Sequence, residues 1–141
     1  MIDHPIFTES IQFIRRELGE TSLEPLQKRI LERMIHTSGD FAIRNLLRFS
    51  PDACNLGVKA LKKGANILAD TSMASVAIKP MSMRTINADV YNVLSWAPDE
   101  VLDGHTRTSI GMQNAWKHFQ KNVQQRIAPL VVIGSSPTAL E

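Results

Sequence analysis

The 141-residue sequence has a single cysteine, no long apolar run and almost no excess of either charge. Cys54 cannot form a disulfide within the chain, and a lone thiol fits a reducing cytoplasm. No apolar run reaches the roughly 18 residues of a transmembrane helix, and the first residues lack the basic and apolar regions of a signal peptide. With 16 basic and 14 acidic residues, the composition calls for neither nucleic acid nor a membrane surface. We therefore expect a cytoplasmic protein.

Several motifs that would name an enzyme class are also missing. The chain has no Gly-x-Gly-x-x-Gly, no Walker loop and no Gly-x-Ser-x-Gly nucleophile elbow. Its four histidines show no close metal-ligand spacing, so we expect no metal. Cys54 lies in a helical pattern without a neighbouring histidine, which favours packing over nucleophilic catalysis.

What the chain does contain is an alternation of helical patterns and short apolar runs. Helical periodicity covers residues 6–18, 23–36 (with Ser22 as N-cap), 50–64 and 108–126. On the second of these helices, we expect Lys28, Arg29, Glu32 and Arg33 to face water. The runs at 66–69, 90–94 and 130–133 are typical of buried parallel strands. We expect a short helical turn at 41–47, a loop at 81–87, a short helix at 98–104 and a helix opened by 134–138. This order predicts one α/β domain over 1–141 with a mostly parallel sheet.

The segment 34–40 ends the second helical pattern, and a histidine stands at the junction. The apolar stripe runs directly into His36, while Gly39 can end that helix and Asp40 can cap the next one. Histidine donates or accepts a proton readily near neutral pH, so His36 is a candidate for proton transfer. The alternative is a hydrogen-bonded structural histidine. Because the apolar stripe leads directly into it, we expect His36 to lie at the margin of the core.

Two segments could hold an anion. Residues 134–138 follow a strand and precede a helix, where free backbone N–H groups and the helix dipole favour negative charge. Ser135 and Ser136 add hydroxyl donors there, although Ser136 could equally be a simple N-cap. Residues 104–108 form a second such segment, in which Arg107 could hold a carboxylate with its guanidinium or could simply be solvated. Ser10 lies near the start of the first helix. It is a candidate site residue, and the alternative is that it is an ordinary solvated serine of the surface.

Taken in order, these motifs resemble the precorrin-8X methylmutase family, also called cobalt-precorrin-8 methylmutases or precorrin isomerases, of the cobalamin pathway. The matching pieces are His4-Pro5-Ile6, Arg33-Met34-Ile35-His36-Thr37-Ser38-Gly39-Asp40, Phe49-Ser50-Pro51, Ala60-Leu61-Lys62-Lys63-Gly64-Ala65, Ile67-Leu68-Ala69-Asp70 with Met73, Gly104-His105-Thr106-Arg107-Thr108, and Ile133-Gly134-Ser135-Ser136-Pro137-Thr138-Ala139-Leu140. Together they cover essentially the whole chain.

The resemblance implies an isomerase that moves a methyl group from C-11 to C-12 of a corrinoid ring without an organic cofactor. It implies His36 as proton donor to a polycarboxylate corrinoid substrate. It also implies a three-layer α/β/α sandwich with a doubly wound sheet, and a homodimer or higher oligomer with its pocket near the subunit interface. The residues implied to bind substrate are Ser10, Thr37, Thr106, Arg107, Ser135, Ser136 and Thr138.

The chain departs from the family in two places. Ala77 stands where the family usually has glycine, which removes access to positive φ and adds a methyl group. Family members also continue beyond the Pro-Thr-Ala-Leu segment with a further strand and helix. We therefore expect a sheet that is incomplete at its C-terminal edge. A non-catalytic corrinoid-binding or tetrapyrrole-binding protein, and an assembly partner of a separately encoded segment, are the alternative functions.

Overall fold

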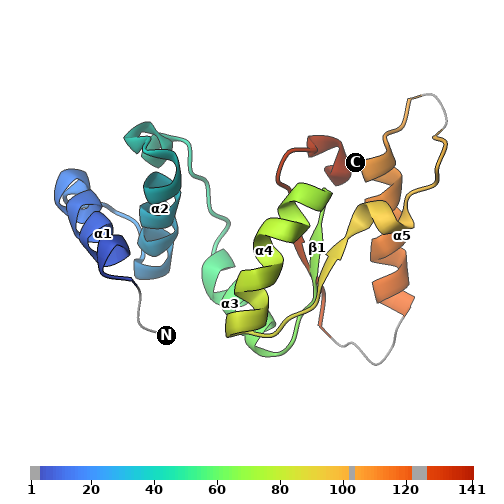
Figure 1. Cartoon of the computed structure of the whole chain (residues 1–141), viewed down its shortest axis with the longest axis horizontal. Coiled ribbons are helices and arrows are strands. Elements are labelled where there is room, and N and C mark those ends of the chain that lie inside the picture. The colour runs from blue at the N-terminus through green and yellow to red at the C-terminus, as the bar shows by residue number, and fades with distance from the viewer. Residues whose placement is uncertain (1–3, 102–103, 122–126) are drawn as a thin grey trace. The chain divides into compact units, whose positions relative to one another are not determined.

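The computed structural model describes residues 4–101, 104–121 and 127–141. The chain forms two compact units, Met1–Leu56 and Gly57–Glu141 (Figure 1). In these described ranges, no helix is both long and apolar enough to cross a membrane. The expectation of one domain over 1–141 stays a prediction.

The N-terminal unit is a helical hairpin. Helix α1 (Pro5–Leu18) and helix α2 (Pro25–Ser38) pack together, and the short 3-10 helix η1 (Phe41–Asn45) follows. One face of each long helix is buried, as the three- and four-residue spacing of apolar side chains predicts. The buried side chains are Ile11, Ile14, Leu18, Leu31 and Ile35.

The ends of α2 differ from the prediction, and the difference places His36 inside the helix. Ser22 is not the N-cap. Glu24 takes that role in a capping box with Gln27, because the fixed φ of Pro25 suits the first helical position. The helix ends at Gly39, which has a left-handed φ of 71° and donates its N–H to the carbonyl of Ile35. His36 therefore lies in the last turn.

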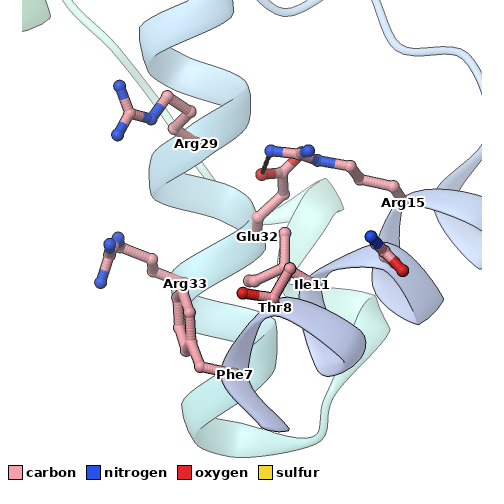
Figure 2. Close-up of a pocket in the computed structure, with 8 residues that line it drawn as sticks. Phe7, Thr8, Ile11, Arg15, Arg29, Glu32 and Arg33 are labelled. Atoms are coloured by element: carbon pink, nitrogen blue, oxygen red, sulfur yellow. Dashed lines mark hydrogen bonds and ion pairs between the residues drawn. The ribbon is translucent and has the colours of Figure 1, made fainter. Parts of the chain in front are cut away.

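Glu32 is also buried, although its helical position predicted a water-facing side chain. It lies between the two helices because Arg15 of α1 reaches across to it (Figure 2). The guanidinium donates from Nε to Oε1 at 2.8 Å and from Nη2 to Oε2 at 2.9 Å, a two-point contact that satisfies the buried carboxylate. The hydrogen bonds that Arg15 donates to Glu32, and then the negative charge of Glu32, raise the pKa of the Arg15 guanidinium.

The C-terminal unit is built on a parallel sheet, and helix α3 (Ala53–Lys62) crosses the boundary between the units. The elements that follow α3 alternate between strands and helices. They are β1 (Ile67–Ala69), α4 (Ser72–Thr85), β2 (Val90–Asn92), the 3-10 helix η2 (Val93–Trp96), α5 (Arg107–Lys121), β3 (Leu130–Val132) and the 3-10 helix η3 (Pro137–Leu140).

The strand order β2-β1-β3 makes the sheet doubly wound. All pairs are parallel, with Ile67 opposite Val90 on one side and Leu130 on the other. The chain leaves β1 through α4 to one neighbour and returns from β2 through α5 to the other. Right-handed crossovers then place the two helices on opposite faces, and Figure 1 shows the strands between α4 and α5. The predicted α/β fold with helices on both faces of a parallel sheet is confirmed. Among the described residues, β2 and β3 are the edge strands.

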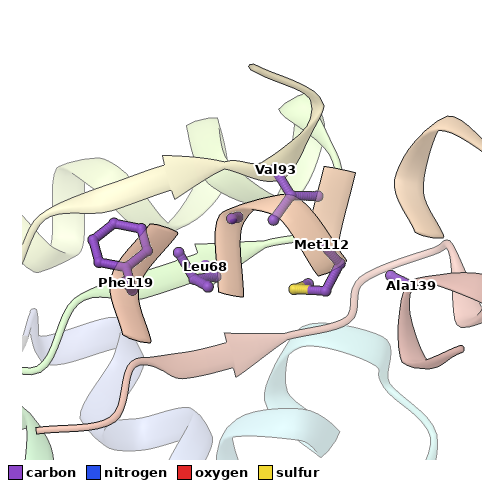
Figure 3. Close-up of a cluster of buried hydrophobic side chains, with 6 residues drawn as sticks. Leu68, Val93, Met112, Phe119 and Ala139 are labelled. Carbon is purple, nitrogen blue, oxygen red and sulfur yellow. The ribbon is translucent and has the colours of Figure 1, made fainter. Parts of the chain in front are cut away.

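The core of this unit lies between β1 and α5 (Figure 3). Leu68 and Val93 are completely buried there. Gly111 lets α5 approach η2 closely, because a Cβ atom at this position would lie 2.5 Å from the carbonyl oxygen of Val93. The full set of buried side chains is Leu68, Val93, Met112, Ala115, Phe119 and Ala139.

The loop predicted at 81–87 is wrong, because α4 runs through Pro80 to Thr85. Thr71 caps the helix by accepting a hydrogen bond from the backbone N–H of Ala74. A proline inside a helix removes one backbone donor, and tertiary packing overrides that local penalty here. The methyl group of Ala77 stands on the exposed side of this helix.

Three further boundaries need correction. Helix α3 begins at Ala53 rather than at Ser50, because Asp52 adopts a positive φ of 56° and forms part of a turn. Residues 98–101 are not helical, and residues 102–103 of that predicted helix lie outside the described part. For the helix predicted at 108–126, residues 122–126 likewise lie outside it.

Candidate functional site

The residues predicted to act on substrate divide between the two units. Ser10, His36 and Thr37 belong to the helical hairpin, on α1 and α2. The α/β unit carries the other five. These are Thr106, Arg107, Ser135, Ser136 and Thr138.

His36 is held by two side chains of α1. The Ser10 hydroxyl oxygen lies 2.7 Å from His36 Nδ1. The ring of Phe7 meets the imidazole edge to face at a centroid distance of 4.8 Å. Nδ1 is engaged by Ser10, so Nε2 is the nitrogen available to an external partner. His36 is exposed, so the expectation that it lies at the margin of the core is wrong.

A cavity of about 170 Å³ opens between α1 and α2 (Figure 2), and Phe7, whose ring contacts His36, is one of the residues that line it. Arg15, Arg29 and Arg33 line it together with Phe7. The guanidinium of Arg33 lies 4.9 Å from the centre of the Phe7 ring, within the range of a cation–π interaction. Phe7 thus contacts Arg33 on its face as well as the imidazole of His36.

Sequence reasoning missed the arginines of this cavity and assigned Arg29 and Arg33 to a solvated face. The spacing could have indicated them. Residues 29, 33 and 36 follow one another at four and three positions, which places them on one side of a helix. A histidine with two arginines on the same side suits a ligand that carries carboxylates.

Thr37 occupies a different position from His36. Its hydroxyl donates a hydrogen bond to the carbonyl of Arg33 at 2.9 Å, within its own helix. It borders a shallow, mostly apolar hollow formed by α2 and η1, with Met34 and Ile43 among its neighbours. Such a hollow is suited to contact with apolar groups rather than with charged ones.

In the α/β unit, β1 and β3 end next to each other, and their following residues interact. Asp70 directly follows β1 and is completely buried. Its Oδ2 accepts hydrogen bonds from the backbone N–H groups of Ser135, at 2.9 Å, and Ser136, at 2.7 Å. Backbone N–H groups of the segment 134–138 hold an anion, but that anion is the protein's own Asp70, and the binding of substrate by this segment stays a prediction. These two N–H groups are therefore not free for a ligand.

The hydrogen bonds determine the ionisation of Asp70. Burial raises the pKa of its carboxyl, but donors from Ser135, Gly134 and Ser136, together with the Thr71 hydroxyl, lower it more. The net result is a pKa below the ordinary value of 3.8, so the carboxylate is charged at neutral pH.

Four hydroxyl groups cluster beside this carboxylate–amide contact. Thr106 Oγ1 lies 2.8 Å from Thr138 Oγ1, and Thr108 Oγ1 lies 2.6 Å from Ser136 Oγ. Thr106 also caps α5 by accepting the N–H of Ser109. The cluster holds more close oxygen pairs than hydroxyl protons, so its protons can be redirected toward an incoming acceptor. Thr108 was not among the predicted site residues.

Arg107 and Ser135 lie outside the hydroxyl network in the described structure. Arg107 is exposed at the first position of α5, and its Nε donates to the carbonyl of Pro98 at 3.2 Å. Ser135 is also exposed, and its backbone N–H donates to Asp70 Oδ2. Both could meet a ligand from the solvent side.

The fold and these residues define the class of protein as a doubly wound α/β protein with a polar cluster at the carboxyl ends of its strands. This is the edge where such sheets bind ligands. The family model for precorrin-8X methylmutase matches residues 5–141. The chain therefore belongs to the precorrin-8X methylmutase family.

Individual relatives agree with this assignment. A cobalt-precorrin-8 methylmutase from Synechocystis is 31% identical, over 99% of this chain and 67% of the relative. A precorrin-8X methylmutase from Pseudomonas aeruginosa is 30% identical, over 96% of this chain and 62% of the relative. The structure of precorrin-8X methylmutase from Thermus thermophilus matches with a TM-score of 0.78 and 32% identity, over 97% of this chain and 65% of that one. The chain thus spans about two thirds of the length of these relatives.

Proposed function

We propose that this protein moves a methyl group from C-11 to C-12 of precorrin-8X or cobalt-precorrin-8, with His36 as the proton donor. The observation that carries the proposal is the 2.7 Å contact between Ser10 and His36 Nδ1. It orients the imidazole through Nδ1, so Nε2 is the nitrogen that could deliver a proton to a ligand. The family resemblance independently assigns proton donation to the same position.

The reaction is an isomerisation, so it consumes no co-reactant. Delivery of a proton from Nε2 to the ring-C region withdraws electron density from that part of the macrocycle. The methyl group then leaves C-11 and forms its new bond at C-12, and the proton returns to His36. Such general acid catalysis contributes roughly 10²–10⁴-fold to a rate. His36 delivers this proton from its protonated ring, so the neutral imidazole keeps its other proton on Nδ1, and the Ser10 hydroxyl oxygen accepts from Nδ1 before and after the transfer.

The charges of the hairpin support a polycarboxylate corrinoid as the substrate. Arg29 and Arg33 line the cavity between α1 and α2, and both are exposed. The Arg15 side chain is already paired with Glu32, so it is less available to a ligand. Arg107 and the hydroxyl cluster supply donors in the α/β unit. The homodimer implied by the family stays a prediction, which sedimentation analysis would check.

The decisive experiment follows the visible spectrum of precorrin-8 during incubation with the wild-type protein and with His36→Ala. We expect conversion by the wild type and a rate at least about 10²-fold lower in the variant. His118→Ala, which removes an exposed histidine of the α/β unit, serves as the matched control and should keep the wild-type rate. Circular dichroism checks that both variants fold.

Each other result has a defined meaning. A wild-type protein that converts no substrate would contradict the catalytic proposal. If that protein still binds the product, hydrogenobyrinate, the non-catalytic corrinoid-binding alternative is favoured. If His36→Ala retains the wild-type rate, the proton donor is a different residue.

A further inference from the structure

The buried carboxylate of Asp70 occupies the position in which an external anion would otherwise be expected. Its side chain has no exposed surface, and its Oδ2 accepts from two successive backbone N–H groups, those of Ser135 and Ser136. Its Oδ1 accepts from the hydroxyl of Thr71 at 3.3 Å. The carboxylate therefore connects the end of β1 to the segment that follows β3.

That segment carries two members of the hydroxyl cluster. Ser136 donates its backbone N–H to Asp70 and contributes its side-chain oxygen to the cluster, 2.6 Å from Thr108 Oγ1. Thr138 lies two residues further along the chain and contacts Thr106 at 2.8 Å. The position of the hydroxyls thus depends on the backbone that Asp70 holds.

The packing around the carboxylate leaves little room for another arrangement. A Cβ atom at Gly134 would lie 3.4 Å from Asp70 Oδ1 and 3.1 Å from the Cβ of Ala74. The segment therefore passes close to both the carboxylate and the start of α4. A ligand anion could reach the two N–H groups only by displacing Asp70 itself.

We propose that Asp70 is a positioning residue: its carboxylate occupies the backbone N–H groups of residues 134–136, which are then closed to an external anion. Substrate therefore meets the neighbouring hydroxyls instead, which are those of Thr106, Thr108, Ser136 and Thr138. This inference rests on the proposed function for the identity of the ligand. The role of Asp70 in holding the segment does not depend on it. Asp70 does not touch the ligand in this account, and it acts through Ser136 and Thr138.

Chemical rescue tests the internal-anion part of the proposal without any enzymatic assay. Asp70→Ala empties the carboxylate position, so sodium formate should refill it and raise the Tm of the variant. Sodium chloride at equal ionic strength should not have this effect. Formate that binds the folded state alone raises stability by linkage, so the Tm of the variant should rise by a few °C. Formate should leave the Tm of the wild type and of Ser82→Ala unchanged.

The control Ser82→Ala is matched because it also removes a buried polar side chain. The Ser82 hydroxyl donates to the carbonyl of Ala88, away from the hydroxyl cluster. Both variants therefore lose a buried hydrogen bond, but only Asp70→Ala vacates an anion position. Equal effects of formate on the two variants, or none on Asp70→Ala, would overturn the proposal.

Asp70→Asn provides a second readout that does not depend on the fate of the alanine variant. In the wild type, the amide proton resonances of Ser135 and Ser136 should shift together as acid protonates Asp70. In Asp70→Asn this titration should be absent. If the two amide protons of Asp70→Asn resonate where those of the wild type do and still shift with acid, the proposal is overturned.

Binding of hydrogenobyrinate links the positioning role to function. We expect about tenfold weaker binding to Asp70→Asn than to the wild type, and unchanged binding to Ser82→Ala, as for the loss of about one hydrogen bond. Equal affinity of Asp70→Asn and the wild type contradicts the positioning role. If the wild type binds no corrinoid at all, the proposed function fails, while the formate and amide experiments still decide the role of Asp70.

Discussion

The helical hairpin and the α/β unit differ in how they hold their polar groups. In the hairpin, His36 is exposed and its ring is fixed by one hydrogen bond and one aromatic contact. In the α/β unit, Asp70 is completely buried and holds two backbone N–H groups beside a cluster of hydroxyls. The first arrangement leaves a nitrogen free to exchange a proton, and the second fixes the backbone.

This difference matches the different demands of proton transfer and of binding geometry. A proton donor must reach its ligand, so its reactive nitrogen has to remain open. Groups that orient a ligand act best when their own positions are fixed by further hydrogen bonds. Each unit also has its own core of buried side chains, so a core substitution should destabilise mainly the unit that contains it.

The largest effect should come from Leu31→Ala in the hairpin. Leu31 is completely buried against α1, and removal of such a side chain costs about 2–5 kcal/mol through lost burial and the cavity left behind. Amide hydrogen exchange should show faster exchange throughout α1 and α2, with little change in β1 and α5. Ile30→Ala, whose side chain is 40% exposed, is the matched control and should have a much smaller effect.

Leu68→Ala makes the reciprocal test in the α/β unit. Leu68 is also completely buried, so its loss should accelerate exchange in β1 and α5 rather than in the hairpin. If either substitution accelerates exchange equally in both units, the two units unfold as one and the comparison between them fails.

A smaller effect is expected from Gly111→Ala. The added methyl group would lie 2.5 Å from the carbonyl oxygen of Val93, so α5 or η2 must move, at a cost of about 1–3 kcal/mol. Gly57→Ala, in α3, meets nothing within 4 Å and should instead stabilise by roughly 0.5–1 kcal/mol. Urea unfolding measures both. A neutral Gly111→Ala would show that the contact between α5 and η2 is loose.

The regular elements could be predicted because their signals are local. Alternating helical patterns and apolar runs predicted β1, β2 and β3 to within two residues, and a parallel sheet follows from that order. Helix α4 was missed in part because a proline usually ends a helix, and packing against β1 and β2 overrides this local signal. The burial of Glu32 was missed because its partner, Arg15, lies on another helix.

Local patterns indicate which residue types could form the candidate site, but they do not indicate which of these residues contact one another. The contact of His36 with Ser10 spans 26 positions of the sequence, and the contact of Asp70 with Ser136 spans 66. No local pattern reports such distances. The amide site of residues 134–136 was recognised from its position after a strand, but its occupant became visible only when the ends of β1 and β3 were seen together.

The stability of the α/β unit should depend on pH through the carboxyl group of Asp70. The folded-state pKa of Asp70 lies below its unfolded value of about 3.8, so the unfolded chain binds the extra proton first. Its contribution is therefore fully present above that pH and is lost as the pH falls through the folded-state pKa. Between the folded-state and unfolded-state pKa values of Asp70, the free energy of unfolding should therefore rise with pH by up to about 1.4 kcal/mol per pH unit. Asp70→Asn should remove this slope, and Asp89→Asn, at an exposed acid, should keep it.

The smallest effect is expected from Glu32→Gln in the hairpin. The carboxylate of Glu32 is buried, but the Arg15 side chain is 53% exposed, so water screens the pair and the loss should be about 1 kcal/mol or less. Glutamine can still accept one hydrogen bond from the guanidinium.

Glu17→Gln, which removes the exposed contact of Glu17 with Arg16 at 3.6 Å, should change stability by less than can be measured. Thermal unfolding at low and high salt tests both, since screening should narrow the difference between wild type and Glu32→Gln. A loss as large as that of Leu31→Ala would mean that the ion pair, rather than the apolar face between α1 and α2, determines the stability of the hairpin.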